Sequence, residues 1–223
     1  VRLIDELLDV SRIISGKVEL VRERLALQRV FEAALETSRP LIEAAGHTLV
    51  VRLPEAPLWL DGDLTRLSQV LSNLLNNAAK YTPAGGRIEL GAEARGGELF
   101  IRVIDNGCGI PQDMLTRVFE IFTQVDRTLA RAQGGLGVGL SLVRGLVALH
   151  GGQVTAHSEG PGRGSTFVLR LPLAAAPIAA EVASASPGPS RGPSRRVLVV
   201  DDNVEVGDSV AEVLQLSGHT VRA

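Results

Sequence analysis

Two asparagines and a lysine share one edge of a helical stretch in the middle of the chain. In NLLNNAAKYTP, residues 73–83, Asn73, Asn77 and Lys80 are spaced four and three apart, which places them on one narrow stripe. Carboxamide oxygens are hard, neutral ligands that suit Mg²⁺, and a lysine one turn further on can reach a phosphate. Asn76 lies off this stripe and its role is open. The competing interpretation is a solvated polar stripe on a core helix.

A second candidate is the carboxylate that ends an apolar strand in ELFIRVIDNGCGIP, residues 98–111. Strand side chains alternate, so Asp105 shares a face with the apolar residues and points into the protein. A buried carboxylate needs a hydrogen-bond donor, and the amino group of adenine is a suitable one. Gly107 and Gly109 remove side chains where a flat ligand needs close approach to the backbone. A plain Asp-Asn-Gly turn is the alternative.

Glycines at 134, 135, 137 and 139 lead directly into an amphipathic helix. Free backbone N–H groups at a helix N-terminus attract anions, so this run predicts a phosphate site. Its spacing is Gly-x-Gly-x-Gly and no strand immediately precedes it, which disfavours a dinucleotide-binding Rossmann unit. The same glycines can hinge residues 122–134 as a lid. Further on, the turn Gly-Arg-Gly-Ser-Thr-Phe, residues 162–167, lets Thr166 add a hydroxyl to the pocket.

These residues need a mixed domain to bring them together. Hydrophobic periodicity and turn residues predict helices at 27–45 and 139–150, and a helix capped by Asp61 or Asp63 that carries the asparagines. The expected strands are 18–21, 48–53, 58–60, 87–94, 98–105, 153–157 and 165–171. His150 ends a helix before two glycines, where we expect a structural role for a cation that suits the helix dipole.

The chain divides into four parts. A heptad pattern over residues 1–17 predicts a helix that needs partner helices, residues 18–173 form the mixed domain, the Ala/Pro/Ser-rich 174–194 is a linker, and 195–223 begin a parallel α/β unit. We interpret the chain as a piece of a longer protein. A net charge of −2 gives no electrostatic reason for nucleic-acid binding, one cysteine fits a reducing compartment, and no apolar run is long enough to span a bilayer.

Five segments occur in an order and spacing that resemble a known family. They are Asn-x-x-x-Asn-Ala-x-Lys-Tyr from residue 73, Asp-x-Gly-x-Gly-Ile from 105, Phe-Glu-Ile-Phe from 119, Gly-Leu-Gly-Val-Gly-Leu-Ser from 135 and Gly-Ser-Thr-Phe from 164. Over residues 1–172 this order resembles the nucleotide-binding boxes of bacterial sensor histidine kinases. The helix at 1–17 resembles the second helix of their dimerisation hairpin, and VLVVDDN resembles the first strand of a receiver domain. Together they suggest a hybrid histidine kinase.

The resemblance implies an α+β fold, a two-layer α/β sandwich of the Bergerat ATP-binding type with a mixed sheet covered by helices. The cofactors would be ATP and Mg²⁺, with Asn73 and Asn77 holding the metal, Lys80 meeting phosphate and Asp105 accepting from adenine. The ATP-binding residues that the resemblance implies are Asn73, Asn77, Lys80, Tyr81, Asp105, Gly107, Gly109, Ile110, Gly135, Gly137, Gly139, Leu140 and Thr166. Cys108 stands where the family more often has an aliphatic or small residue, and its role is open.

Members of this family pass the γ-phosphoryl of ATP to a histidine on the first dimerisation helix and then to a receiver aspartate. We expect both acceptors outside Val1–Ala223, so that this chain binds ATP·Mg²⁺ without autophosphorylating. Asp201 and Asp202 match the acidic pair that helps receivers bind Mg²⁺, with helix capping as the alternative. The expected partners are a second copy through the helical hairpin and a receiver domain or response regulator. The expected compartment is the cytoplasm, and membrane anchoring of the parent is open.

Three other functions share parts of this pattern. ATPases of the gyrase, Hsp90 and MutL kind place a glutamate four residues before the magnesium asparagine, where this chain has Asn73, which cannot take a proton at neutral pH. A non-catalytic relay module would have a spoiled nucleotide site, whereas every expected polar residue is present. A serine-phosphorylating anti-sigma relative is disfavoured by the heptad helix and the receiver-like start.

Overall fold

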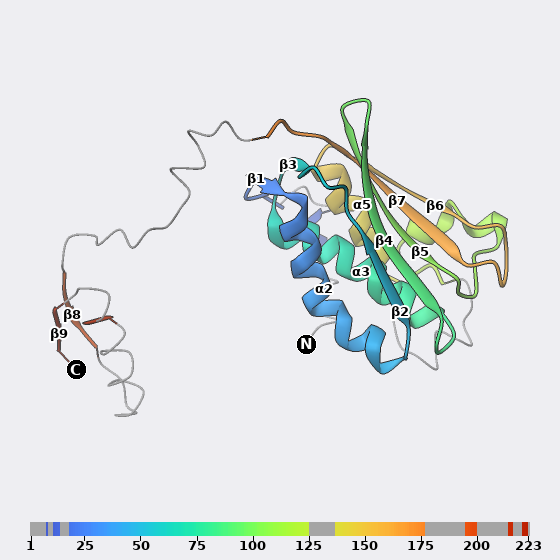
Figure 1. Cartoon of the computed structure of the whole chain (residues 1–223), viewed down its shortest axis with the longest axis horizontal. Coiled ribbons are helices and arrows are strands. Elements are labelled where there is room, and N and C mark those ends of the chain that lie inside the picture. Colours follow the sequence, from blue (N-terminus) through green and yellow to red (C-terminus); the bar gives the residue numbers. More distant parts are fainter. Residues whose placement is uncertain are drawn as a thin grey trace. The chain divides into compact units, whose positions relative to one another are not determined.

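The computed structural model describes residues 8, 11–13, 18–124, 137–176, 195–199, 214–215 and 220–222. The chain forms two compact units, Val1–Ala176 and Pro177–Ala223. Figure 1 shows helices and a sheet in the first unit and a pair of short strands in the second. Among the stretches that the structure describes, none of the helices has the length and apolarity needed to cross a bilayer.

A five-stranded mixed sheet forms one layer of the first unit, in the order β2-β4-β5-β7-β6. The strands are β2 (Thr48–Arg52), β4 (Arg87–Arg95), β5 (Glu98–Asp105), β6 (Gln153–His157) and β7 (Ser165–Pro172). β2 pairs with β4 in parallel, and the other pairs are antiparallel. In the central strand β5 every second residue is buried, from Leu99 to Asp105, so one face of the sheet meets the core.

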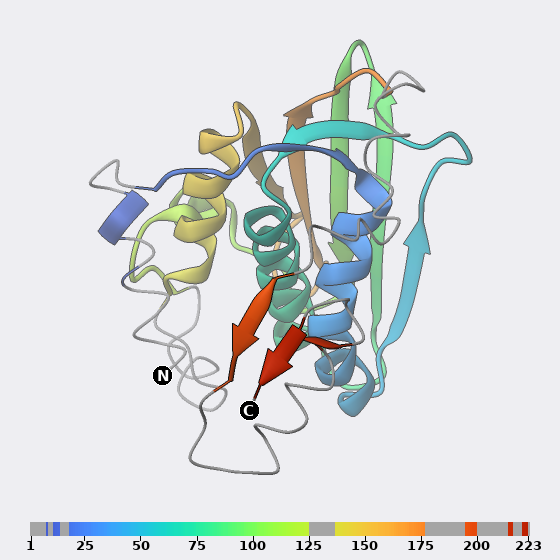
Figure 2. The same ribbon diagram turned by 90° about the vertical axis from the view of Figure 1, so that its left-hand side faces the viewer.

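Three helices cover that face: α2 (Leu27–Ala44), α3 (Leu64–Tyr81) and α5 (Gly139–Leu149). The second view shows the same layering from the side (Figure 2). α3 begins at Asp63, whose carboxylate accepts the N–H of Arg66 and caps the helix. Its leucines pack with residues of α2 and the sheet, and Phe31, Leu74 and Ile88 are fully buried there. The expected two-layer α+β arrangement is confirmed.

The first strand of the unit lies later in the chain than the sequence predicted. The structure places β1 at Glu23–Ala26, antiparallel to β3 (Trp59–Gly62), rather than at residues 18–21. Val21 is 79% exposed, whereas Leu25 is fully buried. Residues 18–21 and 23–26 both contain residues that can form a strand, so pairing with β3 decides which of the two segments does so. Residues 106–122 contain two short 3₁₀ helices, η1 (Gln112–Met114) and η2 (Arg117–Phe119).

In the second unit, β8 (Arg196–Leu198) and β9 (Thr220–Arg222) pair in parallel. Parallel neighbours need a crossover between them, which agrees with the start of an α/β unit. Asp201 and Asp202 lie outside the described residues, so the acidic pair and the receiver assignment stay predictions. Of the heptad segment, only residues 8 and 11–13 are described, and they are helical.

Candidate nucleotide-binding site

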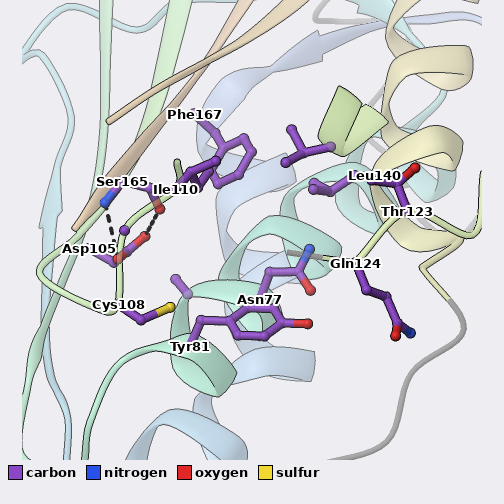
Figure 3. A pocket seen from close by; sticks show the side chains of 13 residues that line it. Asn77, Tyr81, Asp105, Cys108, Ile110, Thr123, Gln124, Leu140, Ser165 and Phe167 are labelled. Carbon is purple, nitrogen blue, oxygen red and sulfur yellow. Dashed lines mark hydrogen bonds between the residues drawn. The ribbon is translucent and has the colours of Figure 1, made fainter. Parts of the chain in front are cut away.

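A pocket opens where α3, η2 and the start of α5 meet the ends of β5 and β7. Its described lining is Asn77, Ala78, Tyr81, Asp105, Cys108, Gly109, Ile110, Val118, Thr123, Gln124, Leu140, Ser165 and Phe167. Figure 3 shows Asp105 and Ser165 at one end and Thr123 and Gln124 at the other, with Asn77 between them. The residues come from five separate segments of the chain, so only the tertiary structure assembles the site.

Asp105 is the buried anion of the pocket, with 7% of its surface exposed. Its Oδ1 accepts the N–H of Gly107 at 2.8 Å and the N–H of Ser165 at 3.2 Å, and its Oδ2 accepts the Ser165 hydroxyl. These donors compensate the burial of the charge and fix the orientation of the carboxylate. A carboxylate has about four acceptor sites, so a donor on a ligand can still bond to it.

Ser165, rather than Thr166, provides the hydroxyl of this pocket. Ser165 lies directly opposite Asp105 in the β5–β7 ladder, so the two side chains stand on the same face. Thr166 lies opposite Ile104 and therefore points to the other face of the sheet. The expectation that Thr166 adds a hydroxyl to the pocket is therefore wrong. The register of the β5–β7 ladder places Ser165, one residue earlier, on the face that carries Asp105.

The side of α3 that lines the pocket differs slightly from the predicted stripe of Asn73, Asn77 and Lys80. Asn77 and Tyr81, four residues apart, both line the pocket. The Lys80 ammonium lies 4.9 Å from the centroid of the Tyr81 ring, and Lys80 is outside the described lining. Asn73 lies one turn before Asn77 on α3, and its Oδ1 is 3.5 Å from the place that a Cβ on Gly139 would occupy. The first residue of α5 and Asn73 therefore face each other.

The donor set near Asn73 and Asn77 fits a hard cation that brings its own negative ligands. The described residues hold no group of three or more His, Cys, Asp or Glu side chains that could bind a metal ion by themselves. Within that part of the chain, neither asparagine side chain makes a hydrogen bond to the protein, so both amide oxygens are available to a ligand. Amide oxygens suit Mg²⁺, which commonly keeps waters and phosphate oxygens as its other ligands.

The turn after β5 is shaped by its contacts with protein backbone. A side chain on Gly107 would collide with the carbonyl oxygen of Tyr81, and one on Gly109, whose φ is +70°, would collide with that of Gly160. Gly164 donates its N–H to Gly107 O at 3.0 Å. The space that these glycines leave is therefore filled by neighbouring backbone and not kept for a ligand. Our expectation that they admit a flat ligand is corrected in this respect, although Gly109 still lines the pocket.

The second glycine run lies at the opposite end of the pocket. Gly137 has a φ of +71°, and a Cβ there would lie 2.7 Å from the carbonyl oxygen of Thr123. Its own carbonyl accepts the N–H of Phe122 at 3.0 Å. Gly139 begins α5, as the sequence predicted. Gly135 and most of the predicted lid lie outside the described residues.

Apolar side chains form the walls between the two ends. Ile110 and Leu140 line the pocket, as the resemblance implied, together with Val118 and Phe167. Phe167 packs edge-on against Phe119 with ring centroids 6.3 Å apart, which joins η2 to β7. Sequence reasoning did not select Val118, Thr123, Gln124, Ser165 or Phe167. Those from residues 106–124 lie in irregular backbone without a periodic signal, and Ser165 needed the strand register.

His150 is buried away from this lining and links two helices. Its Nδ1 donates to Leu146 O at 2.7 Å, and its Nε2 accepts the N–H of Asp63 at 3.1 Å. Burial lowers the pKa of His150, and the nearby Arg22 charge adds to this. The hydrogen bonds support a structural role, but the expected cation is wrong, since Nε2 can accept only in the neutral ring.

Residues 62–175 match the family described as histidine kinase-, DNA gyrase B- and HSP90-like ATPases. The chain belongs to this family.

Among curated relatives, the sensor protein DivL of Caulobacter vibrioides is 39% identical over 77% of this chain. The circadian input-output histidine kinase CikA of Synechococcus elongatus is 34% identical over 98%, and the sensor histidine kinase WalK of Bacillus subtilis is 34% identical over 77%. The chain spans between 21% and 29% of the length of these relatives. The first unit is thus a catalytic domain of the sensor histidine kinase type.

Two solved structures show the same fold. Full-length ShkA in complex with AMPPNP aligns over 100% of this chain and 44% of its own, with a TM-score of 0.68 and 28% identity. The mycobacterial sensor histidine kinase MprB aligns over 69% of this chain and 98% of its own, with a TM-score of 0.59 and 28% identity. The mixed sheet covered by helices is therefore that of the histidine kinase catalytic domain.

Proposed function

We propose that the pocket binds ATP with Mg²⁺ and presents the γ-phosphoryl group to a histidine outside this chain. The observation that carries this proposal is the buried carboxylate of Asp105, held by two donors from Ser165 and one from Gly107 at the end of an apolar pocket. An exocyclic amino group of adenine supplies the missing donor, and Ile110, Leu140 and Phe167 supply apolar walls for its ring. The ShkA structure is a complex with AMPPNP, which supports a nucleotide as the ligand of this fold.

The other end of the pocket has the character of a phosphate site. The N-terminus of α5 faces Asn73, and the free N–H groups of a helix N-terminus favour anions. Asn73 and Asn77 would hold Mg²⁺ through their amide oxygens, and the bound metal would neutralise the charge of the phosphates. Lys80, whose Nζ lies 4.9 Å from the centroid of the Tyr81 ring, would supply a positive charge to a phosphate in this proposal. Thr123 and Gln124 lie there as polar lining.

Phosphoryl transfer is favoured over hydrolysis by the side chains at this end. Asp105 is the single carboxylate among the described lining residues, and it lies at the opposite end from Thr123 and Gln124. Asparagine cannot act as a general base at neutral pH, so neither Asn73 nor Asn77 can activate a water. The pocket therefore provides positioning and electrostatic stabilisation, and the acceptor must bring its own nucleophile.

The acceptor and its partners belong to the longer protein in this proposal. A histidine on a dimerisation helix would receive the phosphoryl group in a homodimer, and a receiver aspartate would receive it next. The hybrid histidine kinase of Dictyostelium discoideum among the relatives supports a receiver as partner. The parallel β8–β9 pair supports the beginning of such a domain in the second unit, with Asp201 and Asp202 as its acidic pair.

Asp105→Asn tests the adenine assignment. The amide keeps one acceptor for the donors of Gly107 and Ser165 but replaces the second acceptor with a donor, which repels the adenine amino group. We expect the affinity for ADP with Mg²⁺ to fall by about tenfold or more, because a hydrogen bond to a charged group contributes roughly 1.5–3 kcal/mol. Titration calorimetry measures this, with the exposed Asp113→Asn as control. Equal affinity of a correctly folded Asp105→Asn protein for ADP would refute the assignment.

A further inference from the structure

A threonine hydroxyl beside Asp105 is buried without a hydrogen-bond partner. Thr82 is 6% exposed, and its Oγ1 bonds to none of the residues that the structure describes. In folded proteins nearly all buried polar groups are paired, because an unpaired one has lost its hydrogen bonds to water and gained none in return. An exception of this kind indicates a group from outside the chain that the hydroxyl binds, either a ligand or an internal water.

The hydroxyl is directed at the turn that follows β5. The position that a Cβ on Gly107 would occupy is 2.9 Å from Thr82 Oγ1 and 2.8 Å from Asp105 Oδ1. The Thr82 methyl carbon lies on another side, against Gly86. The hydroxyl and the carboxylate therefore adjoin the same glycine, at the end of the pocket that Asp105 lines.

Asp105 does not need this hydroxyl as a donor. Its Oδ1, the atom that shares the space beside Gly107, already accepts the N–H of Gly107 and the N–H of Ser165. These two bonds occupy both lone pairs of that oxygen. Its Oδ2 accepts the Ser165 hydroxyl and keeps one acceptor site for a ligand. The bond that Thr82 can make is therefore not one that the carboxylate lacks.

The backbone at Thr82 does not require threonine either. The residue is the C-cap of α3, in an extended conformation with a φ of −99° and a ψ of 130°, which valine adopts as readily. Its N–H donates to Ala78 O at 3.1 Å, and valine would keep that bond. Valine has nearly the same shape and no polar group to leave unpaired. The hydroxyl thus costs the unliganded protein free energy and contributes only when something binds to it.

We propose that Thr82 positions the nucleotide, with its hydroxyl holding a water molecule that bonds to a ring nitrogen of the base. This inference rests on the proposed function, because it takes the ligand of the pocket to be an adenine nucleotide. The bridge is a water because Thr82 is buried and is not among the described lining residues. A water-mediated hydrogen bond is nearly as favourable as a direct one. Asp105 binds the amino group, and Thr82 acts on a ring nitrogen beside it.

Figure 3 shows which ring nitrogen the hydroxyl can serve. Ser165 lies on one side of Asp105, and Cys108 and Tyr81 lie on the other. Thr82 follows Tyr81 at the end of α3, so its hydroxyl belongs to the α3 side of the carboxylate. The amino group of adenine has a ring nitrogen on each side. Thr82 therefore serves only the one that faces α3.

The Thr82→Val variant separates a role in binding from a role in the fold. Without nucleotide, its denaturant midpoint, followed by circular dichroism, should equal or exceed that of the native protein. Its affinity for ADP with Mg²⁺ should be about three- to tenfold lower by calorimetry, because one hydrogen bond is lost. Thr82→Ser keeps the hydroxyl and should bind ADP nearly as well as the native protein. Thr166→Val, on the other face of the sheet, is the matched control and should bind ADP normally.

Analogues of the base identify the atom that the water contacts. In 1-deaza-ADP and in 7-deaza-ADP, one of the two ring nitrogens that flank the amino group is replaced by a CH group. With one of these analogues the native protein and Thr82→Val should bind equally, because the water has lost its acceptor. A difference that persists with both analogues would overturn the proposal. So would a Thr82→Val protein that fails to fold, since the hydroxyl would then serve the structure.

The outcomes distinguish this inference from the proposed function. A native protein that binds no adenine nucleotide would overturn both. A native protein that binds ADP, with an equal affinity in Thr82→Val, would overturn only the role of Thr82. The loss in Thr82→Val should be the same in EDTA as with Mg²⁺, because the base end does not contact the metal. A loss seen only with Mg²⁺ would place the effect at the phosphate end and contradict the proposal.

Discussion

Ser165 donates both its backbone N–H and its hydroxyl to the carboxylate of Asp105, across neighbouring strands β7 and β5. The two donors hold the carboxylate in one orientation at the end of the pocket. This relationship depends on the register of the ladder, which places the two residues opposite each other. It gives the adenine end of the proposed site a fixed acceptor before any ligand binds.

Ser165→Ala should weaken the binding of adenine nucleotides by roughly three- to tenfold, because one hydrogen bond contributes about 1 kcal/mol. The backbone N–H of residue 165 still donates to Asp105, so the carboxylate loses one of its hydrogen bonds and keeps the others. Ser165→Thr keeps the hydroxyl and should bind ADP nearly as well as the native protein. Thr166→Ala is the matched control, since Thr166 faces the other side of the sheet. Calorimetry that shows equal losses for residues 165 and 166 would refute the positioning role.

Asn77→Ala should weaken the dependence of nucleotide binding on magnesium. With Mg²⁺ we expect an affinity for ADP about tenfold lower than that of the native protein, on the order of 1.4 kcal/mol, because the metal loses one ligand. In EDTA the two proteins should bind equally. Asn76→Ala serves as control on the same helix, because Asn76 is outside the described pocket lining. A magnesium effect as large in Asn77→Ala as in the native protein would show that Asn77 does not hold the metal.

Gly109→Ala should destabilise the first unit by more than about 2 kcal/mol, from the left-handed backbone and the collision with Gly160 together. The φ of Gly109 is +70°, and its missing side chain leaves room for the Gly160 carbonyl. Gly96→Ala provides the comparison, since its φ is +61° but nothing lies within 4 Å of its Cβ. It should cost only about 1–2 kcal/mol. Chemical unfolding followed by circular dichroism measures both, and equal losses would contradict the backbone contact.

His150 predicts a dependence of stability on pH. The unfolded imidazole takes a proton near its ordinary pKa of 6.5, whereas burial lowers the pKa in the folded protein. The folded state therefore binds fewer protons, so the free energy of unfolding rises with pH in this window. His150 contributes its full stabilisation above about pH 6.5 and loses it as the pH falls from there toward the folded pKa.

His150→Ala should lower the free energy of unfolding at pH 7.5 by about 2–3 kcal/mol, since it leaves the buried N–H of Asp63 without a partner. The difference between native and variant should shrink toward acid pH. His157→Ala, on an exposed side chain, should change neither quantity. Guanidinium unfolding at pH 5.5, 6.5 and 7.5 measures the difference. A gap between native and variant that grows as the pH falls would have the wrong sign for a neutral, buried imidazole.

The sequence by itself determined the elements and the order of the site segments. Periodicity located α2, α3 and α5, and alternation located the β4–β5 hairpin, because both patterns arise from local geometry and burial of one face. Asp105 and Asn77 were found as candidates since a polar side chain in an apolar pattern is locally unusual. These features need only residues that are close in the chain.

Tertiary structure decided what depends on partners far apart in the chain. Ser165 replaced Thr166 because the β5–β7 register selects the face of each residue, and no local pattern specifies that register. The first strand moved to residues 23–26 because β3 pairs there. His150 became a neutral acceptor because Asp63, far away in sequence, directs its N–H at the ring. The contact between Ile13 and Gly145 of α5 likewise depends on two segments far apart in the chain, because a glycine within a helix does not by itself show which residue packs against it.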